Sequence, residues 1–365
     1  MAAKQRGISR DLIIHPGETI ADVLEERGIS QAELATCTGV TPVYVSNVIH
    51  GKKDISARFA LALEYALGVP KSFWINLQAH YDAELLEFNE MQSITDEERC
   101  VRDSLKDMVK YFRKEGQMLD GETKDESILS LRKVLRISNL VNVREIVPAG
   151  AFRMGKQGSV NADVLGAWVR LCQISMENKR ATGTFRAEDV EKLTKDLKNI
   201  MLKNEHNTLE SLQYVFAKYG IVFDVVRNFK GAPVQGYVAS RQNGSYQMVV
   251  TLRNAYKDIF WFSVFHELGH IVNGDVGKNS KFLDDESEQD KEAAADAFAR
   301  ESLISEADYR VFTEKGSFTI ESIKKFSASQ SVMPYIVIGR LQKEKKLPYD
   351  RFVKYKEVYK WADCK

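Results

Sequence analysis

The feature that most constrains this chain is a His-Glu-x-x-His motif inside an apolar run. Residues 261–272 read WFSVFHELGHIV, a run long enough to form a buried helix. Residues four apart lie on the same face of a helix, so His266 and His270 can present their imidazoles to one metal ion. Glu267 is placed beside them to act as a general base on a water molecule. The motif therefore predicts a buried helix that carries a metal site.

Zinc suits this set of donors, because it accepts imidazole nitrogen and carboxylate oxygen and retains a coordination position for water. Bound zinc lowers the pKa of that water to about 7, which provides a nucleophile near neutral pH. No histidine follows His270 in the sequence. The third ligand is therefore expected to be a carboxylate.

Glu292 is the expected carboxylate ligand. It lies in the helical stretch KEAAADAFAR at residues 291–300, four residues before Asp296 on the same helix face, and the alanines allow a second helix to approach closely. Asp296 is expected to accept a ring N–H from one histidine and so fix its tautomer. The alternative is that both acids lie on a solvated face. The rival ligands are the acids of the preceding loop, namely Asp284, Asp285, Glu286 and Glu288.

These segments resemble the ImmA/IrrE metallopeptidases. The resemblance rests on FWFSVFHELGH and on the E-x-x-x-D-x-F-A pattern that begins at Glu292, with AFR, AWVR and PVQGYVAS upstream and IVIGRLQ downstream. It covers residues 145–361 and implies a zincin-like metallopeptidase domain. The roles it implies are zinc binding by His266, His270 and Glu292, and base catalysis by Glu267.

The chain departs from that family's pattern in two places. Ala294 stands where many relatives have an acid, and the Met-Pro-Tyr of residues 333–335 stands where His-Pro-Gly is usual. Neither departure removes an expected ligand.

The N-terminal part carries an independent pattern of short capped helices. Residues 16–27 have helical spacing and end at Gly28. A capping box begins at Ser30, and Gly39 provides the turn before a third helix that Thr41 caps. Two short helices joined by a turn that contains glycine predict a helix-turn-helix.

The third helix is expected to read DNA. Its apolar residues Val45, Val48 and Ile49 face inward, which leaves small polar groups and an aromatic ring outward. The expected contacts are with base edges from Thr41, Val43, Tyr44, Ser46 and Asn47, and with phosphates from Gln31, Lys52 and Lys53. Residues 15–75 hold five Lys or Arg and seven acids, so the electrostatic attraction to DNA is modest. The alternative is a helical bundle that serves only dimerisation.

This part is similar to the Xre-type repressors of the HigA antidote group over residues 12–90. The similar segments are HPGETIADVLEERGISQAELA, VSNVIHGKK and LGVPKSFWINLQAHYD. The order of a repressor domain followed by an ImmA/IrrE domain also resembles a recurrent bacterial and phage arrangement. The expected partners are double-stranded operator DNA, a second copy of the chain as a homodimer, and a possible partner toxin.

Composition agrees with an ordinary globular protein of two or three domains. The 365 residues are 44% hydrophobic and 28% charged, and the net charge of +1 gives no general attraction to nucleic acid or membrane. The four cysteines are scattered without a CxxC spacing, and residues 1–11 lack an apolar signal core. The protein is expected to be cytoplasmic, with no membrane partner.

The expected fold class is mainly α with a small β-sheet. Its domains are a helix-turn-helix domain at 12–90, a helical spacer or linker at 91–145 and a metallopeptidase domain at 146–361. The expected helices of the middle are 70–92, 95–115, 128–137, 159–178, 187–203 and 208–219, with a break at 116–127. The expected strands are 221–226, 234–239 and 246–252. An exposed edge of this sheet could pair with an extended peptide, and Gly236 and Gly244 would permit close backbone approach or a turn.

Together the two patterns predict a transcriptional regulator with a zinc endopeptidase domain, constitutive or latent, that cleaves a regulatory protein such as a repressor. Glu267 would take a proton from water and deliver it to the leaving nitrogen. The alternative is an antidote-type repressor whose second domain senses a ligand or binds a toxin without proteolysis.

Overall fold

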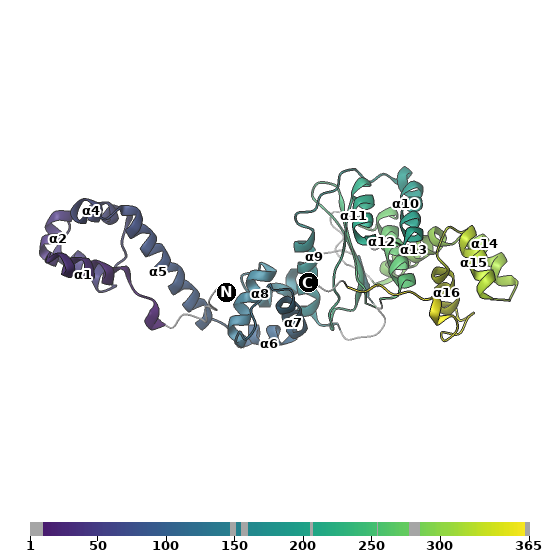
Figure 1. Ribbon diagram of the computed structural model, residues 1–365, viewed down its shortest axis with the longest axis horizontal. Coiled ribbons are helices and arrows are strands. Elements are labelled where there is room, and N and C mark those ends of the chain that lie inside the picture. The colour runs from purple at the N-terminus through teal and green to yellow at the C-terminus, as the bar shows by residue number, and fades with distance from the viewer. Residues whose placement is uncertain are drawn as a thin grey trace. The chain divides into compact units, whose positions relative to one another are not determined.

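A computed structural model describes residues 10–146, 151–154, 160–204, 207–253, 255–276 and 285–361, with the backbone alone at 11, 151–154 and 285–288 (Figure 1). The chain divides into two compact units. One comprises Met1–Cys100 with Leu119–Ser130, and the other comprises Val101–Met118 with Leu131–Lys365. The division at 12–90, 91–145 and 146–361 remains a proposal.

The first unit contains a bundle of short capped helices. The Ser30 hydroxyl accepts the N–H of Glu33, and the Thr41 hydroxyl accepts that of Tyr44. Gly28 ends the first helix with a φ of 66°, which only glycine adopts without strain. The core of the bundle contains Ile20, Leu34, Val45, Leu63 and Trp74, all almost wholly inaccessible to solvent. The helices are α1 (Pro16–Arg27), α2 (Gln31–Thr38), α3 (Pro42–Ile49), α4 (Ala57–Leu67) and α5 (Lys71–Gln92).

The segment after α5 differs from the expected helices at 95–115 and 128–137. The first is two helices, α6 (Asp96–Ser104) and α7 (Lys106–Lys114), because the backbone at Leu105 leaves the helical region at φ −87° and ψ 12°. The next helix, α8 (Lys124–Leu135), begins inside the expected break. Thr123 and Glu126 form a capping box that starts this helix. The Thr123 hydroxyl accepts the N–H of Glu126 at 3.2 Å, and the Glu126 carboxylate accepts the N–H of Thr123 at 2.7 Å. A 3-10 helix, Leu140–Ile146, follows.

The second unit contains one four-stranded sheet with the order β1-β3-β4-β2. The strands are β1 (Ala151–Met154), β2 (Ile221–Val225), β3 (Val234–Ser240) and β4 (Tyr246–Val250). β3 is antiparallel to both β1 and β4, whereas β2 is parallel to β4. β1 was not expected from the sequence. Because β3 has a partner on each side, the outer strands of the described sheet are β1 and β2.

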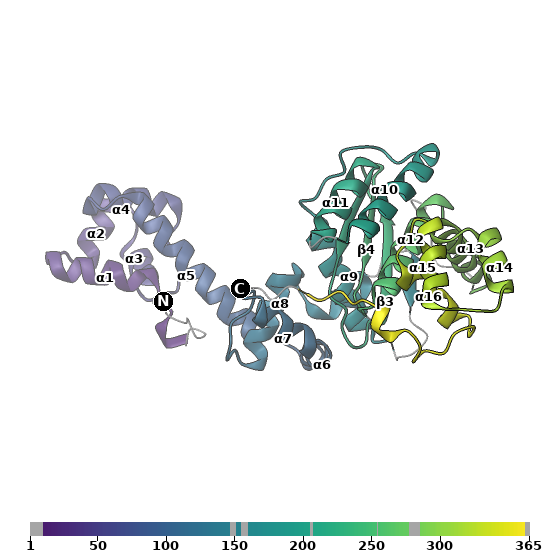
Figure 2. The ribbon, with the colours of Figure 1, turned by 45° about the vertical axis from the view of Figure 1, so that its right-hand side comes forward.

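Helices pack around this sheet, and α12 is the most deeply buried of those described. Every residue of α12 from Ser263 to Ile271 is buried. Its neighbours include α13, α16 and strands β3 and β4 (Figure 2). The aromatic residues Phe223, Trp261 and Phe265 lie in the same core. The helices of this unit are α9 (Ala162–Met176), α10 (Val190–Lys203), α11 (Thr208–Lys218), α12 (Lys257–Val272), α13 (Asp285–Leu303), α14 (Glu306–Glu314), α15 (Ile320–Ser329) and α16 (Pro334–Lys343).

The protein is therefore mainly α-helical with a small sheet, as the sequence predicted. Among the described residues, no helix combines the length and apolarity needed to cross a bilayer.

Candidate metal centre

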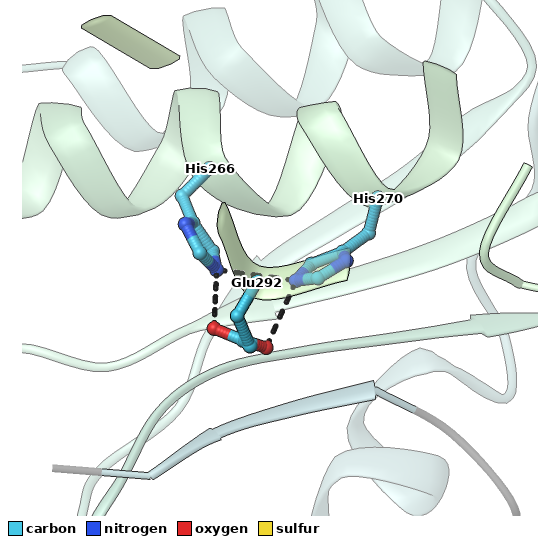
Figure 3. A group of neighbouring side chains, drawn as sticks. All are labelled: His266, His270 and Glu292. Carbon is cyan, nitrogen blue, oxygen red and sulfur yellow. Dashed lines mark hydrogen bonds and ion pairs between the residues drawn. The ribbon is translucent and has the colours of Figure 1, made fainter. Parts of the chain in front are cut away.

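Helices α12 and α13 bring two imidazoles and one carboxylate together (Figure 3). The Nε2 atoms of His266 and His270 lie 3.1 Å apart. The two carboxylate oxygens of Glu292 lie 3.2 Å from Nε2 of His266 and 3.3 Å from Nε2 of His270. Among the described side chains, this is the group of acids, histidines and cysteines close enough to share a metal ion. The rival acids Asp284, Asp285, Glu286 and Glu288 lie outside the described side chains.

The opposite nitrogen of each imidazole is held by a further carboxylate. Nδ1 of His266 lies 2.8 Å from Oδ1 of Asp296, and Nδ1 of His270 lies 2.9 Å from Oδ2 of Asp275. An ionised carboxylate accepts hydrogen bonds and cannot donate them, so each Nδ1 carries a hydrogen and donates it to the aspartate. Each Nε2 then faces the cluster, where it can give up its proton to bind a metal ion.

Asp275 is a residue that the sequence analysis missed. It follows the helix stop at Gly274, whose φ of 76° turns the chain back. The Asp275 N–H then donates to the carbonyl of His270, at 3.0 Å. The available signal was an acid directly after the stop of the motif helix.

Small residues set the spacing between α12 and α13. A Cβ at Gly269 would lie 3.0 Å from Cα of Ala295 and 3.2 Å from the ring of Phe298. Glycine and alanine therefore allow the two backbones to approach closely. The departure at Ala294 lies on the exposed side of α13. The substituted residues at 333–335 cap and begin α16.

Glu267 lies between α12 and strand β3 and is fully buried. A Cβ on Gly236 would lie 2.1 Å from its carboxylate oxygen Oε1, so glycine alone fits at this point of β3. Gly244 serves differently, with a φ of 80° in the β3–β4 turn and open space around it.

The charges of the cluster stabilise one another. Burial would lower the pKa of His270, but hydrogen bonds with Glu292 and Asp275 and the charge of Glu267 outweigh it and raise that pKa to about 9. Burial would likewise raise the pKa of Glu292, yet both histidines lower it to about 2. The ionised Glu292 carboxylate therefore favours a proton on the His270 imidazole, and a bound metal ion would take the place of that proton.

The expected DNA-contact residues all lie on or beside α2 and α3, with different exposure. Val43 is 68% exposed, whereas Tyr44 is half-buried in a T-shaped contact with Phe59 at 5.1 Å between ring centroids. The ammonium of Lys53 lies 4.1 Å above the Tyr44 ring. Tyr44 thus packs against its own domain rather than pointing wholly outward. Of the others, Gln31, Thr41 and Lys52 are exposed, and Ser46 and Asn47 are half-buried.

Two known families match separate parts of the chain. The family described as Helix-turn-helix matches residues 20–74, and the family described as Peptidase U49 matches residues 229–323. The second match includes every residue of the metal cluster.

Curated relatives match over short stretches. "Virulence-associated protein A'" of Dichelobacter nodosus is 41% identical over 69 residues, which is 19% of this chain and 60% of the relative. "Virulence-associated protein I" of the same organism is 33% identical over 82 residues, which is 22% of this chain and 75% of the relative. The "Uncharacterized HTH-type transcriptional regulator YddM" of Escherichia coli (strain K12) is 30% identical over 63 residues, which is 17% of this chain and 67% of the relative. The chain thus spans about three fifths of the length of the first of these.

Two solved structures also show likeness. A putative antidote protein of a plasmid maintenance system from Nostoc punctiforme is 33% identical, with a TM-score of 0.20 over 22% of this chain and 97% of that one. An addiction module antidote protein of a HigA family from Coxiella burnetii is 30% identical, with a TM-score of 0.21 over 22% of this chain and 95% of that one.

Proposed function

We propose that this chain is a DNA-binding regulator that hydrolyses a peptide bond in another regulatory protein. Its N-terminal domain belongs to the Xre-type helix-turn-helix family, and its second domain is a Peptidase U49 domain of the ImmA/IrrE family. The observation that carries the proposal is the convergence of two imidazole Nε2 atoms on the Glu292 carboxylate. The substrate we infer is a repressor.

The donor set fits a zinc ion held by His266, His270 and Glu292. Two nitrogens and a carboxylate are the ligands of one common class of catalytic zinc site, and the carboxylates on Nδ1 orient both rings as such sites require. When bound, zinc supplies Lewis acidity at the scissile carbonyl and lowers the pKa of a water molecule.

The proposed proton carrier is Glu267. It follows His266 directly and lies against the backbone of β3 at Gly236, within the same buried region. Its carboxylate would accept a proton from the attacking water and deliver it to the leaving nitrogen of the cleaved bond. Burial excludes bulk water from that transfer.

The proposed DNA contact is made by α3, with the chain acting as a homodimer. Val43 and the exposed cation Lys52 are available to DNA, and the half-buried Asn47 offers an amide that can hydrogen-bond a base edge. The proposed location of these events is the cytoplasm, where operator DNA and a repressor substrate are both present.

The test of this function is the Glu267→Gln variant. Glutamine has nearly the same shape but cannot accept the proton, a step typically worth about 10²–10⁴-fold in rate. The variant should keep zinc and fold yet lose proteolysis. The variant would be co-expressed with a repressor chosen from the neighbouring genes and followed by immunoblot and a promoter reporter. The repressor should stay intact and its target genes silent.

Two outcomes would contradict the proposal. Undiminished cleavage by the variant would reject Glu267 as the base. Wild-type gene regulation by a variant that cannot cleave would favour the alternative function, in which the second domain senses a ligand or binds a toxin without proteolysis.

A further inference from the structure

The second unit contains a cavity of about 450 Å³ that is separate from the metal cluster. The described residues that line it come mainly from α12, α13 and α16, and they include none of His266, His270 and Glu292. Its volume lies within the range of pockets that bind small molecules. The cavity is therefore a candidate ligand site in its own right.

One part of the cavity wall is apolar. Ile259 and Phe262 line it from α12, Leu303 from α13 and Ile336 from α16. Leu303 and Ile336 belong to the hydrophobic core of this unit, and Phe262 packs against that core. Close packing holds these side chains in place, so the wall offers a preformed apolar surface to the body of a small molecule.

The charged side chains of the lining have a positive excess. Both acids that line the cavity are paired with cations that line it as well. Asp258 lies 2.9 Å from the ammonium of Lys356, and Glu344 lies 3.0 Å from the guanidinium of Arg340. The described lining holds two further cations, Arg300 and Lys343, so its net charge favours an anionic ligand.

The two further cations are more accessible to solvent than the two paired ones. The Arg300 side chain is 39% exposed and Lys343 is exposed, whereas the side chains of Arg340 and Lys356 are 10% and 11% exposed. A ligand can therefore reach Arg300 and Lys343 with a charged group that stays partly hydrated, while its apolar body enters the cavity.

The surroundings of these two cations favour a singly charged group. The ammonium of Lys343 lies 4.6 Å above the Phe262 ring, so it is close to the apolar wall. The guanidinium of Arg300 lies 3.9 Å from Asp296, which offsets part of its charge at a distance too long for a hydrogen bond. A carboxylate could bind the guanidinium at shorter range through two parallel hydrogen bonds.

We propose that this cavity binds a small apolar carboxylate, with the carboxylate at Arg300 and Lys343 and the apolar body against Phe262, Leu303 and Ile336. This inference goes beyond the proposed function and does not depend on it, because the ligand would bind whether or not the chain cleaves a protein.

The test measures binding of three compounds with the same alkyl chain to the full-length protein by calorimetry. The probes are octanoate, octan-1-ol and octylamine. Octanoate should bind at about one molecule per chain and about tenfold or more tightly than the other two, because only its head group pairs with the cations. Similar affinities for all three compounds would overturn the proposal.

A carboxylate could also bind a zinc ion, so the titration is repeated on metal-free and on zinc-loaded protein. Octanoate should bind both forms with similar affinity, since no ligand of the cluster lines the cavity. Binding that requires zinc would place the carboxylate at the metal centre and overturn the cavity site.

Two variants locate the binding in the cavity. The double variant Arg300→Gln, Lys343→Gln should lose about tenfold or more in octanoate affinity. Its control is Lys315→Gln, Lys325→Gln, which removes the same charge at exposed positions away from the cavity and should bind octanoate as wild type does. Ile259→Trp fills the cavity and should abolish binding. Wild-type affinity in the Arg300, Lys343 double variant would overturn the proposal, even if Ile259→Trp does not fold.

Discussion

Each imidazole of the cluster has its two nitrogens engaged on opposite sides. Nδ1 donates to an aspartate, and Nε2 faces Glu292. The pairing fixes the tautomer and the ring orientation before any ion arrives. Pre-set ligands lose little freedom on binding, so the arrangement favours tight retention of one zinc.

We expect purified protein to hold about one zinc per chain, and His266→Ala to lose it, because one nitrogen ligand of the set is removed. His80→Ala removes an exposed histidine of α5 and should retain the zinc. Metal content by mass spectrometry measures both. Full occupancy in the His266→Ala protein would refute the ligand assignment.

Asp275→Asn should weaken zinc binding about 10–100-fold without removing a ligand, because the partner that orients His270 is altered. Asp290→Asn, at an exposed position of α13, is the matched control and should leave the affinity unchanged. Competition with a chromogenic chelator gives both constants. Equal affinities in the two variants would show that Asp275 does not act on the site.

We expect His15 to make the stability of the start of α1 depend on pH. Its Nδ1 accepts the N–H of Gly17, and burial lowers its pKa below the ordinary value. The nearby carboxylates oppose this shift without cancelling it; they belong to Glu18, Asp54 and Asp82. The unfolded chain therefore takes up the proton more readily than the folded one.

The stabilisation from His15 is thus present above the unfolded pKa of about 6.5 and is lost as pH falls through the folded value. Hydrogen exchange, corrected for the intrinsic pH effect, should show α1 opening more readily at pH 5 than at pH 7. In His15→Asn the cap remains but does not titrate, so this added opening should vanish. A variant as pH-sensitive as wild type would assign the effect elsewhere.

Among the elements, the contact between α12 and α13 determines whether three ligands can meet. Gly269→Ala would push the backbones apart at Ala295, one turn from Glu292, and should lower zinc affinity as well as stability. Gly316→Ala is the control, since its φ of 63° makes alanine strained but nothing lies nearby. The control should lose about 1 kcal/mol of stability and no zinc affinity. A Gly269→Ala protein with unchanged zinc affinity would contradict this account.

Most elements could be predicted from the sequence because their signals are local. Caps at Ser30 and Thr41, and the spacing of the two histidines, are visible within a few residues. β1 could not be predicted, because its partner in the described sheet is β3, and the paired residues Met154 and Val234 are eighty positions apart. The bond between Asp275 and His270 depends on the reversal at Gly274. The contact of Tyr44 with Phe59 depends on how α4 packs.

For the whole molecule, the proposed DNA contacts and the proposed metal site lie in different units. Lys52→Ala should lower operator affinity, reduce the salt slope by about 1 and leave zinc content unchanged. Asn47→Ala should cost about 1–3 kcal/mol at one operator position. Gel shifts on the upstream region of the gene, at several salt concentrations, measure these effects. A Lys52→Ala protein with an unchanged salt slope would remove that residue from the phosphate contacts.

Unbroken burial along α12 also bears on which sequence changes the chain can tolerate. A typical amphipathic helix has a solvent side where most substitutions are neutral, but residues 263–271 have none. A saturation library selected for function should therefore show nine consecutive positions that reject nearly every substitution. The tolerant positions that recur once per turn of an amphipathic helix should be missing. The stretch of sequence that this site constrains should accordingly extend well beyond the five residues of the histidine motif.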